Sequence, residues 1–434
     1  MQNRPFGIIL LILCFFTVTV QGQKKINSPY SRFNLGSLST SAPFRSTGMG
    51  GAGIAMRDDY SVYFANPASY TSIDTSSFIF DFGADLSRSQ LDDGTTKFHS
   101  ADLNFNHLLM GFPVSRKFGF AFGLVPYSNG YYYLSQVVRS GDPGYDPNAG
   151  EVTYVHKGSG SLSNLFVGTG FKLTKKLSLG VNMNVVFGEL TRLNQFEFAD
   201  YSNAYNQNST ENLRVHGFHF DYGLQYSTKI KKKYFVTAGL SYTAPGRITS
   251  SLEELATRFT VYTTSAIDTL SYSTSSSKDS TKLPGSYKAG LSFGKIDKFT
   301  VEVDYVYTNW AKARIHNDNA NLASTSSWAL GLEYIPEKFS NTSFVKRVNY
   351  RFGAHLSDNY LTLNGVQLKE YGASAGLGFY LKGTPGSPAS QANLFFDFTR
   401  RKGDISKGMY NENIISVGFS LNLYDWWFVK RKYD

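Results

Sequence analysis

The feature that most constrains this chain is an alternation of apolar and small or polar residues with a period of two. Phe118, Phe120, Phe122 and Leu124 alternate with glycine and alanine, and the segment Ile415–Leu423 alternates in the same way with serine, glycine and asparagine. Successive side chains of a β-strand point to opposite faces, so each such segment has one apolar and one polar face. Glycine would be scarce on the outer face of a soluble β-sandwich. The pattern therefore favours a barrel with its apolar face in lipid and its polar face in the lumen.

The composition agrees with that interpretation. Charged residues make up 18% of the 434 residues and aromatic residues 16%, and there are 40 glycines. An average soluble protein carries about 25% charged residues. The aromatic content excludes a disordered chain. No apolar run of 18 or more residues, the length of a spanning helix, follows the N-terminus, which excludes a helical-bundle membrane protein.

The alternating segments number about fourteen, and the connections between them are alternately short and long. The segments begin near residues 76, 100, 117, 158, 176, 213, 233, 285, 298, 326, 346, 367, 391 and 412. The long connections are Ser128–Val152, Glu189–Asn212 and Pro245–Pro284. We therefore predict an all-β fold: a transmembrane antiparallel β-barrel of about 14 strands over residues 76–434, with both termini at the side of the short turns. Asp425-Trp426-Trp427-Phe428 would form an aromatic girdle at the membrane boundary.

The first residues have the pattern of an export signal. Arg4 precedes the apolar run Phe6–Val20, and Gly22 offers a small residue at a cleavage position. We predict a cleaved signal peptide over residues 1–22, which removes Cys14, the one cysteine, and directs the chain to the outer membrane of a Gram-negative cell. The alternative is a membrane anchor, for which the run is short.

The net charge of +10 does not point to nucleic acid. The basic residues form short clusters, such as Lys175-Lys176 and Lys231-Lys232-Lys233, each in an expected turn. They are typical of a solvated rim, with attraction to anionic lipid head groups as the functional alternative.

Residues 23–75 do not follow the period of two and precede the first strand. Their tyrosines, methionines, phenylalanines and glycines favour a packed plug inside the barrel over a free tail. The stretch Gly48–Gly53 formally matches a dinucleotide-binding G-x-G-x-x-G, but no βαβ unit surrounds it. We therefore expect its glycines to serve tight backbone packing.

Three short motifs in this segment resemble the hatch of the FadL-type (FadL/OMPP1/TodX-like) outer-membrane transport proteins. They are Gly51-Ala52-Gly53-Ile54-Ala55, Asp58-Asp59 and Asn66-Pro67-Ala68. Asn27–Phe33 resembles the Bacteroidota branch of that family, and Tyr307–Trp310 and Arg351-Phe352-Gly353 resemble its strand motifs. Asp58 and Asp59 are expected to cap a short helix or to pair with an arginine of the lumen.

The resemblance implies that an N-terminal hatch closes a fourteen-stranded barrel. Hydrophobic ligands would enter from outside, bind in apolar pockets and leave sideways through a kink in the third strand. The matching stretch contains Pro126, Tyr127 and Gly130 as the lateral gate. Proline cannot donate to a β-ladder, so pairing is expected to break there, unless Pro126 simply ends the strand. The candidate ligand contacts in the hatch are Met49, Ile54, Met56, Tyr60, Tyr63 and Phe64.

No catalytic constellation is visible, and we expect neither an enzyme nor a cofactor or metal. His216 and His219 are three residues apart and would lie on opposite faces of a strand. The acidic loop between Asp142 and Glu151 could hold calcium, although such loops are usually only solvated.

Two functions remain. The first is passive transport of hydrophobic, long-chain fatty-acid-like molecules, with outer-membrane lipids and a hydrophobic small molecule as partners and no nucleic acid. Burial of apolar ligand surface would supply the affinity, at about 25 cal/mol per Å². The second is a non-transporting FadL-like barrel that acts as a scaffold or cargo-shuttle component of an outer-membrane or type IX secretion assembly, with the long loops contacting protein partners. An open general porin is a weaker third choice, because a plug argues against a clear pore.

Overall fold

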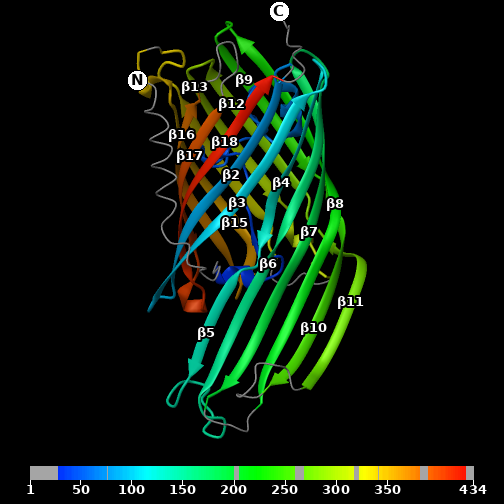
Figure 1. The fold of residues 1–434 in the computed structure, drawn as a ribbon, viewed down its shortest axis with the longest axis vertical. Coiled ribbons are helices and arrows are strands. Elements are labelled where there is room, and N and C mark those ends of the chain that lie inside the picture. The colour runs from blue at the N-terminus through cyan, green and yellow to red at the C-terminus, as the bar shows by residue number, and fades with distance from the viewer. Residues whose placement is uncertain are drawn as a thin grey trace, which may run out of the picture.

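The fold is a closed antiparallel β-barrel (Figure 1). The computed structural model describes residues 28–75, 77–199, 205–259, 268–316, 322–340, 342–381 and 390–426. The predicted signal peptide, residues 1–22, and the girdle residues Trp427 and Phe428 lie outside these ranges. No helix among the described residues is long and apolar enough to cross a membrane.

Fourteen strands form the wall, each antiparallel to its neighbours, and the last pairs with the first to close the ring. They are β2 (Ser77–Asp92), β3 (Lys97–Pro113), β4 (Phe118–Asn129), β6 (Val152–Lys172), β7 (Leu177–Phe198), β8 (Asn206–Ile230), β9 (Tyr234–Thr243), β12 (Ser286–Lys295), β13 (Phe299–Thr308), β14 (Thr325–Tyr334), β15 (Asn349–Leu363), β16 (Val366–Tyr380), β17 (Gln391–Lys402) and β18 (Asn411–Trp426). The predicted fourteen-stranded all-β barrel is thus confirmed.

The remaining elements are short or lie beyond the wall. Near the wall's long connections are β5 (Tyr132–Val138), β10 (Arg247–Phe259), β11 (Asp268–Lys282), η3 (Trp310–Lys312) and η5 (Ile405–Lys407). The N-terminal part contains η1 (Pro29–Arg32), β1 (Ser37–Leu38), α2 (Phe44–Thr47) and η2 (Pro67–Ser72), and η4 (Val345–Arg347) precedes β15. We call the side of the short connections, such as residues 114–117, the turn end, and the side from which β5, β10 and β11 project the loop end.

β-Strands occupy much of the predicted long connections. The stretch 128–152 contains β5, the stretch 245–284 contains the hairpin of β10 and β11, and β7 and β8 extend through most of 189–212. The regular alternation of apolar and polar residues fades in these extensions. Their threonine and tyrosine residues still favour extended backbone. The same effect explains why β6 and β8 begin before the predicted residues 158 and 213.

The apolar side chains of the wall point outward. Leu291, Leu330 and Phe352 are more than half exposed, whereas their inward-facing neighbours Glu302 and Arg351 are fully buried. This is the reverse of a soluble core, and it suits a cylinder surrounded by hydrocarbon, because ring closure leaves no unpaired strand edge facing lipid.

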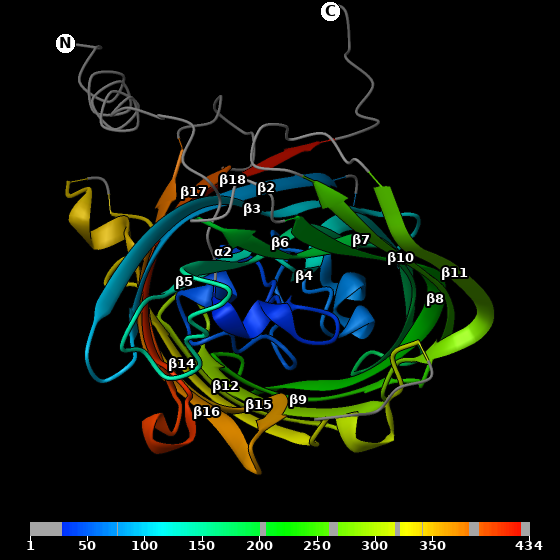
Figure 2. The ribbon, with the colours of Figure 1, turned by 90° about the horizontal axis from the view of Figure 1, so that it is seen from below.

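Residues 28–75, which we call the inner segment, lie inside the ring (Figure 2, blue). Near the loop end, the Tyr30 hydroxyl donates to the Tyr410 carbonyl at 2.5 Å. Near the turn end, the Tyr424 hydroxyl donates to Asp74 at 3.5 Å. The inner segment therefore passes along the lumen from the loop end to the start of β2.

Candidate functional site

The glycine-rich motif of the inner segment is held by two carboxylates of β13. Asp304 Oδ2 accepts hydrogen bonds from the backbone N–H of Gly53 (2.7 Å) and of Ile54 (3.0 Å). Glu302 Oε1 accepts one from the N–H of Ala55 at 2.8 Å. These three bonds fix consecutive peptide units of the motif against the wall.

Glycines of the wall make room for this contact. A Cβ atom at Gly290 would lie 2.9 Å from the Cβ atom of Ile54, and one at Gly239 would lie 2.4 Å from the Ile54 carbonyl oxygen. Both distances are shorter than packed atoms allow. The glycines on the inward rows, which the sequence marked only as a polar face, are thus the positions where the inner segment touches the wall.

Asn66 of the Asn66-Pro67-Ala68 motif is fully buried and bridges three parts of the chain. Its Nδ2 donates to the carbonyl of Ile54 at 2.9 Å and, at 3.2 Å, to those of Leu224 on β8 and Leu240 on β9. Its Oδ1 accepts from the N–H of Ala68 and so caps η2, which begins at Pro67. Asn66 therefore joins the two hatch-like motifs to each other and to the wall.

Asp58 belongs to a buried ionic network between the inner segment and the wall. It pairs with Arg45 of α2 and accepts a hydrogen bond from the Tyr63 hydroxyl at 2.8 Å. Arg45 also pairs with Glu333 of β14 at 2.7 Å, and Glu333 pairs with Arg351 of β15 at 2.7 Å. Burial opposes the charge of Arg45, but the Asp58 and Glu333 carboxylates outweigh it and raise the pKa of the guanidinium.

For Asp58, the expected pairing with an arginine of the lumen is present, and that arginine, Arg45, belongs to the inner segment itself. Asp58 also accepts a hydrogen bond from the N–H of Tyr60 at 2.8 Å, which closes a local turn rather than capping a helix. Asp59 is exposed.

The six candidate ligand contacts do not surround one open space. Met49, Met56 and Tyr63 pack together and are at most 2% exposed, and Ile54 is 3% exposed against the wall. Tyr60 lies against Tyr424, with ring centroids 4.9 Å apart, and Phe64 stacks on Phe166 at 5.3 Å. Their apolar surface is largely occupied by contacts within the protein.

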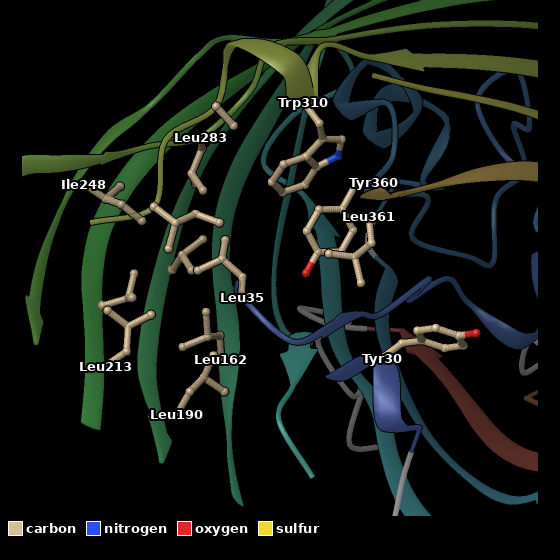
Figure 3. Packing of buried hydrophobic residues seen from close by; sticks show 14 of the residues in the cluster. Tyr30, Leu35, Leu162, Leu190, Leu213, Ile248, Leu283, Trp310, Tyr360 and Leu361 are labelled. Atoms are coloured by element: carbon tan, nitrogen blue, oxygen red, sulfur yellow. The ribbon is translucent and has the colours of Figure 1, made fainter. Parts of the chain in front are cut away.

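A larger apolar region lies nearer the loop end (Figure 3). We call it the apolar lumen cluster. Leu35 and Leu162 are fully buried in it, and the rings of Trp310 and Tyr360 lie opposite them, 4.7 Å apart. Its buried members are Tyr30, Leu35, Leu162, Val186, Leu190, Leu213, Val215, Ile248, Leu283, Trp310, Ala313, Ile315, Tyr360, Leu361, Leu368 and Met409.

Sequence reasoning missed this cluster, although a signal was present. Leu162 is an even number of residues from Asn164, and Leu190 is an even number of residues from Asn182 and Asn184, so each leucine shares a strand face with those asparagines. Both leucines therefore stand on the polar, inward-facing row of their strands. Apolar residues on an inward row near the loop end are the sequence signal of this apolar cluster.

The backbone pairing changes next to this cluster, at Pro126. Pairing of β3 with β4 ends at Leu108 and Leu124, and from His107 to Lys97 β3 pairs with β2. Beyond Leu124, β4 continues along β6 with a register shift after Pro126. The expectation that pairing breaks here is correct for the edge toward β3. The alternative, that Pro126 ends the strand, is wrong, because β4 runs to Asn129.

The inner segment takes the place that β3 leaves. Ser37 and Leu38 of β1 pair with Asn129 and Ser128, and the N–H of Ser39 donates to the Tyr127 carbonyl at 2.9 Å. Leu38 and Tyr127 also pack against the apolar lumen cluster. Gly130 N donates to the Gly160 carbonyl on β6 at 3.0 Å, so the chain stays attached to β6 past the end of β4.

The acidic loop considered for calcium has other contacts. Asp142 Oδ2 accepts from the N–H of Arg139 at 2.8 Å, and Glu151 pairs with the Arg139 guanidinium at 3.2 Å. Within the described residues, no group of three or more His, Cys, Asp or Glu side chains could hold a metal ion.

Comparison with known proteins identifies a family model and several solved structures that resemble this chain. No curated protein matches the chain. A family model described as BamG matches residues 6–434. Among solved structures, a FadL homologue from Pseudomonas aeruginosa is 13% identical with a TM-score of 0.57, covering 90% of this chain and 99% of that one.

Two toluene transporters are similar as well. TbuX from Ralstonia pickettii is 13% identical with a TM-score of 0.54, covering 88% of this chain and 98% of that one. TodX from Pseudomonas putida is 14% identical with a TM-score of 0.53, covering 92% and 100%. At such identities the likeness shows a shared fold, which confirms the FadL-like barrel expected from the motifs.

Proposed function

This chain belongs to the BamG family and has a FadL-like barrel, and we propose that it passively transports hydrophobic, long-chain fatty-acid-like molecules across an outer membrane. The observation that carries the proposal is the apolar lumen cluster beside the place where β4 separates from β3. The exported state, with residues 1–22 removed as a signal peptide, belongs to the same proposal, as does membership of the Bacteroidota branch.

In this proposal the molecule enters from the loop end and binds in the apolar lumen cluster. Apolar contact with a flexible chain needs no directional partner and stabilises binding by about 25 cal/mol per Å² of buried ligand surface. The hatch residues Met49, Ile54, Met56, Tyr60, Tyr63 and Phe64 would contact the molecule after a local rearrangement, since most are packed. Residues 23–75 would act as the hatch that blocks a straight path to the turn end.

Release would occur sideways into the bilayer at Pro126, Tyr127 and Gly130. Support comes from the edge of β4 that β3 leaves and that β1 covers with two residues, Ser37 and Leu38. Unpaired backbone at membrane depth is tolerated only against protein or a water-filled cavity. β1 is therefore the element that must move for the wall to open.

A disulfide between β1 and β4 tests the release step. Leu38 and Ser128 are direct partners, and no described residue is a cysteine. The L38C/S128C variant should lose uptake of radiolabelled fatty acid under oxidising conditions and regain it with a reductant. The matched control V303C/L330C links two partners within the wall and should transport in both states. Uptake by oxidised L38C/S128C would contradict lateral release, and equal uptake with and without the protein would contradict transport.

The projecting hairpin of β10 and β11 favours a second candidate, a scaffold or secretion component. β10 pairs with β8, β11 pairs with β10, and residues 268–276 of β11 are exposed, with Leu270 at 45% and Tyr272 at 59%. An exposed strand is a template for pairing with another polypeptide. Cross-linking from position 272 in cells should capture a defined protein partner if this function holds. Capture of none would count against it.

A further inference from the structure

The connection between β14 and β15, residues 335–348, is longer than most connections at the turn end. Four others there span only residues 114–117, 173–176, 231–233 and 296–298. The 335–348 connection contains η4 and presents three large apolar side chains to its surroundings: Phe339 is 74% exposed, Phe344 55% and Val345 62%. Exposed apolar patches usually mark an interaction site.

The connection is a folded unit and not a loose loop. The N–H of Glu337 donates to the Lys346 carbonyl at 2.8 Å and joins the two sides of the connection. The guanidinium of Arg347 donates to the Ser340 carbonyl at 3.1 Å, and Ser340 is buried. These contacts hold Phe339 and Phe344 outward in fixed positions.

The part of the connection around Phe344 rests on the outer face of the barrel, whereas Lys338 lies beside Tyr60 of the inner segment. The ring of Phe344 stacks on that of Phe379 of β16, with centroids 5.8 Å apart and planes within 3°. The hydroxyl of Tyr350 of β15 donates to the Val345 carbonyl at 3.1 Å. Tyr350 lies between the inward, buried residues Asn349 and Arg351, so it points outward. Figure 1 shows this connection as the gold coil at the upper left, beside β16 and β17.

We propose that the described residues of this connection, 335–340 and 342–348, form a membrane-interface anchor in the leaflet at the turn end. Phe339, Phe344 and Val345 lie at the boundary between hydrocarbon and head groups, continuous with lipid-facing wall residues such as Phe352. Lys346 and Arg347 lie at the level of lipid phosphates. The inference rests on the barrel standing in a bilayer, as the proposed function has it, and does not depend on transport.

The placement of the patch favours lipid over a protein partner. It is stacked on outward rows of the wall, whose other exposed members, such as Phe352 and Leu377, face the same surroundings. Aromatic side chains at the ends of spanning segments, with nearby cations, are typical of the boundary between hydrocarbon and head groups. Lys346 keeps more than half of its side chain exposed while it pairs with Glu337 at 3.3 Å, so it remains accessible to phosphate.

Spin labels can measure this position directly, because no described residue is a cysteine. The full chain would be placed in vesicles of phosphatidylethanolamine and phosphatidylglycerol with a label at F344C. Collision with oxygen should exceed collision with a water-soluble nickel complex, as for the lipid-facing control F352C. The water control Y272C, on the projecting β11, should show the opposite.

Each outcome decides a different point. A label at F344C that behaves like Y272C overturns the anchor and leaves the patch to a protein partner. A label at F352C that behaves like Y272C overturns the bilayer placement, and with it the proposed function. Adding K346Q/R347Q should raise nickel access at F344C, whereas K175Q/K176Q in another turn should not. If K346Q/R347Q and K175Q/K176Q give equal nickel access at F344C, the phosphate contact is overturned.

Discussion

In the half of the lumen near the turn end, the inner segment is attached by directional contacts: Asp304 and Glu302 accept from backbone amides, and Asn66 bridges two strands. In the half near the loop end, the same segment keeps hydrogen bonds such as those of Ser28 with Glu412 and of Tyr30 with Tyr410, but it also packs against the apolar lumen cluster. Hydrogen bonds require fixed geometry, whereas apolar contacts tolerate exchange of one apolar group for another. In the proposed transport function, the first half positions the inner segment and the second half accepts the hydrophobic molecule.

The largest loss in the free energy of unfolding should appear when a buried charge is removed from the half of the lumen near the turn end, which we call the positioning half. E333Q leaves Arg45 and Arg351 without their shared carboxylate and should lower the free energy of unfolding by about 3–5 kcal/mol. Urea titration in lipid vesicles measures it. The control E337Q removes a carboxylate from an exposed pair and should change the free energy by less than about 0.5 kcal/mol. Equal effects would mean that the Glu333 network does not hold the segment.

In the half near the loop end, truncation of an apolar side chain should lower the free energy of unfolding by less than removal of the buried charge does, but by a measurable amount. L162A removes a fully buried leucine and should lower the free energy of unfolding by about 2–5 kcal/mol, the upper end applying only if the cluster cannot relax around the cavity. L165A, on the outward row of the same strand, should cost less than about 1 kcal/mol. A value for L162A near that of L165A would show that the cluster is loosely packed.

A smaller loss of stability is expected at Gly290, a wall glycine that leaves space for the inner segment. G290A places a Cβ atom 2.3 Å from Asp304 Oδ1 and 2.9 Å from Ile54, and the neighbours must shift, which should cost about 1–3 kcal/mol. Limited proteolysis within residues 28–75 should become faster. A289S, on the neighbouring outward position, serves as control and should leave the proteolysis rate unchanged. Unchanged proteolysis of G290A would argue that the close contact at Gly290 is dispensable.

The smallest effect is expected at Tyr30, where the inner segment meets the loop end. Y30F removes hydrogen bonds with Tyr410 and should cost about 0.5–1.5 kcal/mol at neutral pH. Burial raises the pKa of the Tyr30 hydroxyl to about 12, from an ordinary value of 10.0. The unfolded chain therefore loses this proton first, and the hydroxyl's contribution to stability is full below pH 10 and is lost as the pH rises through about 12. Unfolding titrations at several pH values should show a smaller alkaline loss in Y30F, and parallel curves would contradict this.

The wall could be predicted from sequence because lipid on one side and lumen on the other impose a period of two on every strand. That signal located the starts of most wall strands, from Ser77 to Asn411, within a few residues. It failed for β10 and β11, whose sequences lack a regular apolar row. The positions of Asn66 and Gly53 at the wall depend on carbonyl groups and carboxylates hundreds of residues away, and only the family resemblance pointed to them.

The candidate ligand residues were harder to predict because apolar residues in a glycine-rich segment can pack or bind equally well. Met49 and Tyr63 resembled ligand contacts by type, yet each is enclosed by its own neighbours. Leu162 and Leu190 resemble ordinary strand residues by type, and only their position on the same strand face as nearby asparagines marks them as inward-facing.

The covering of β4 by β1 has a consequence for assembly. The edge of β4 near Asn129 finds its partner in residues that precede the whole barrel in the chain, and the ring is closed by β2 and β18, whose residues are far apart in sequence. Such distant pairings form slowly, because a long loop must close before they contribute. The pairing of β1 with β4 and the pairing of β2 with β18 are therefore expected to be the slow steps in forming this barrel.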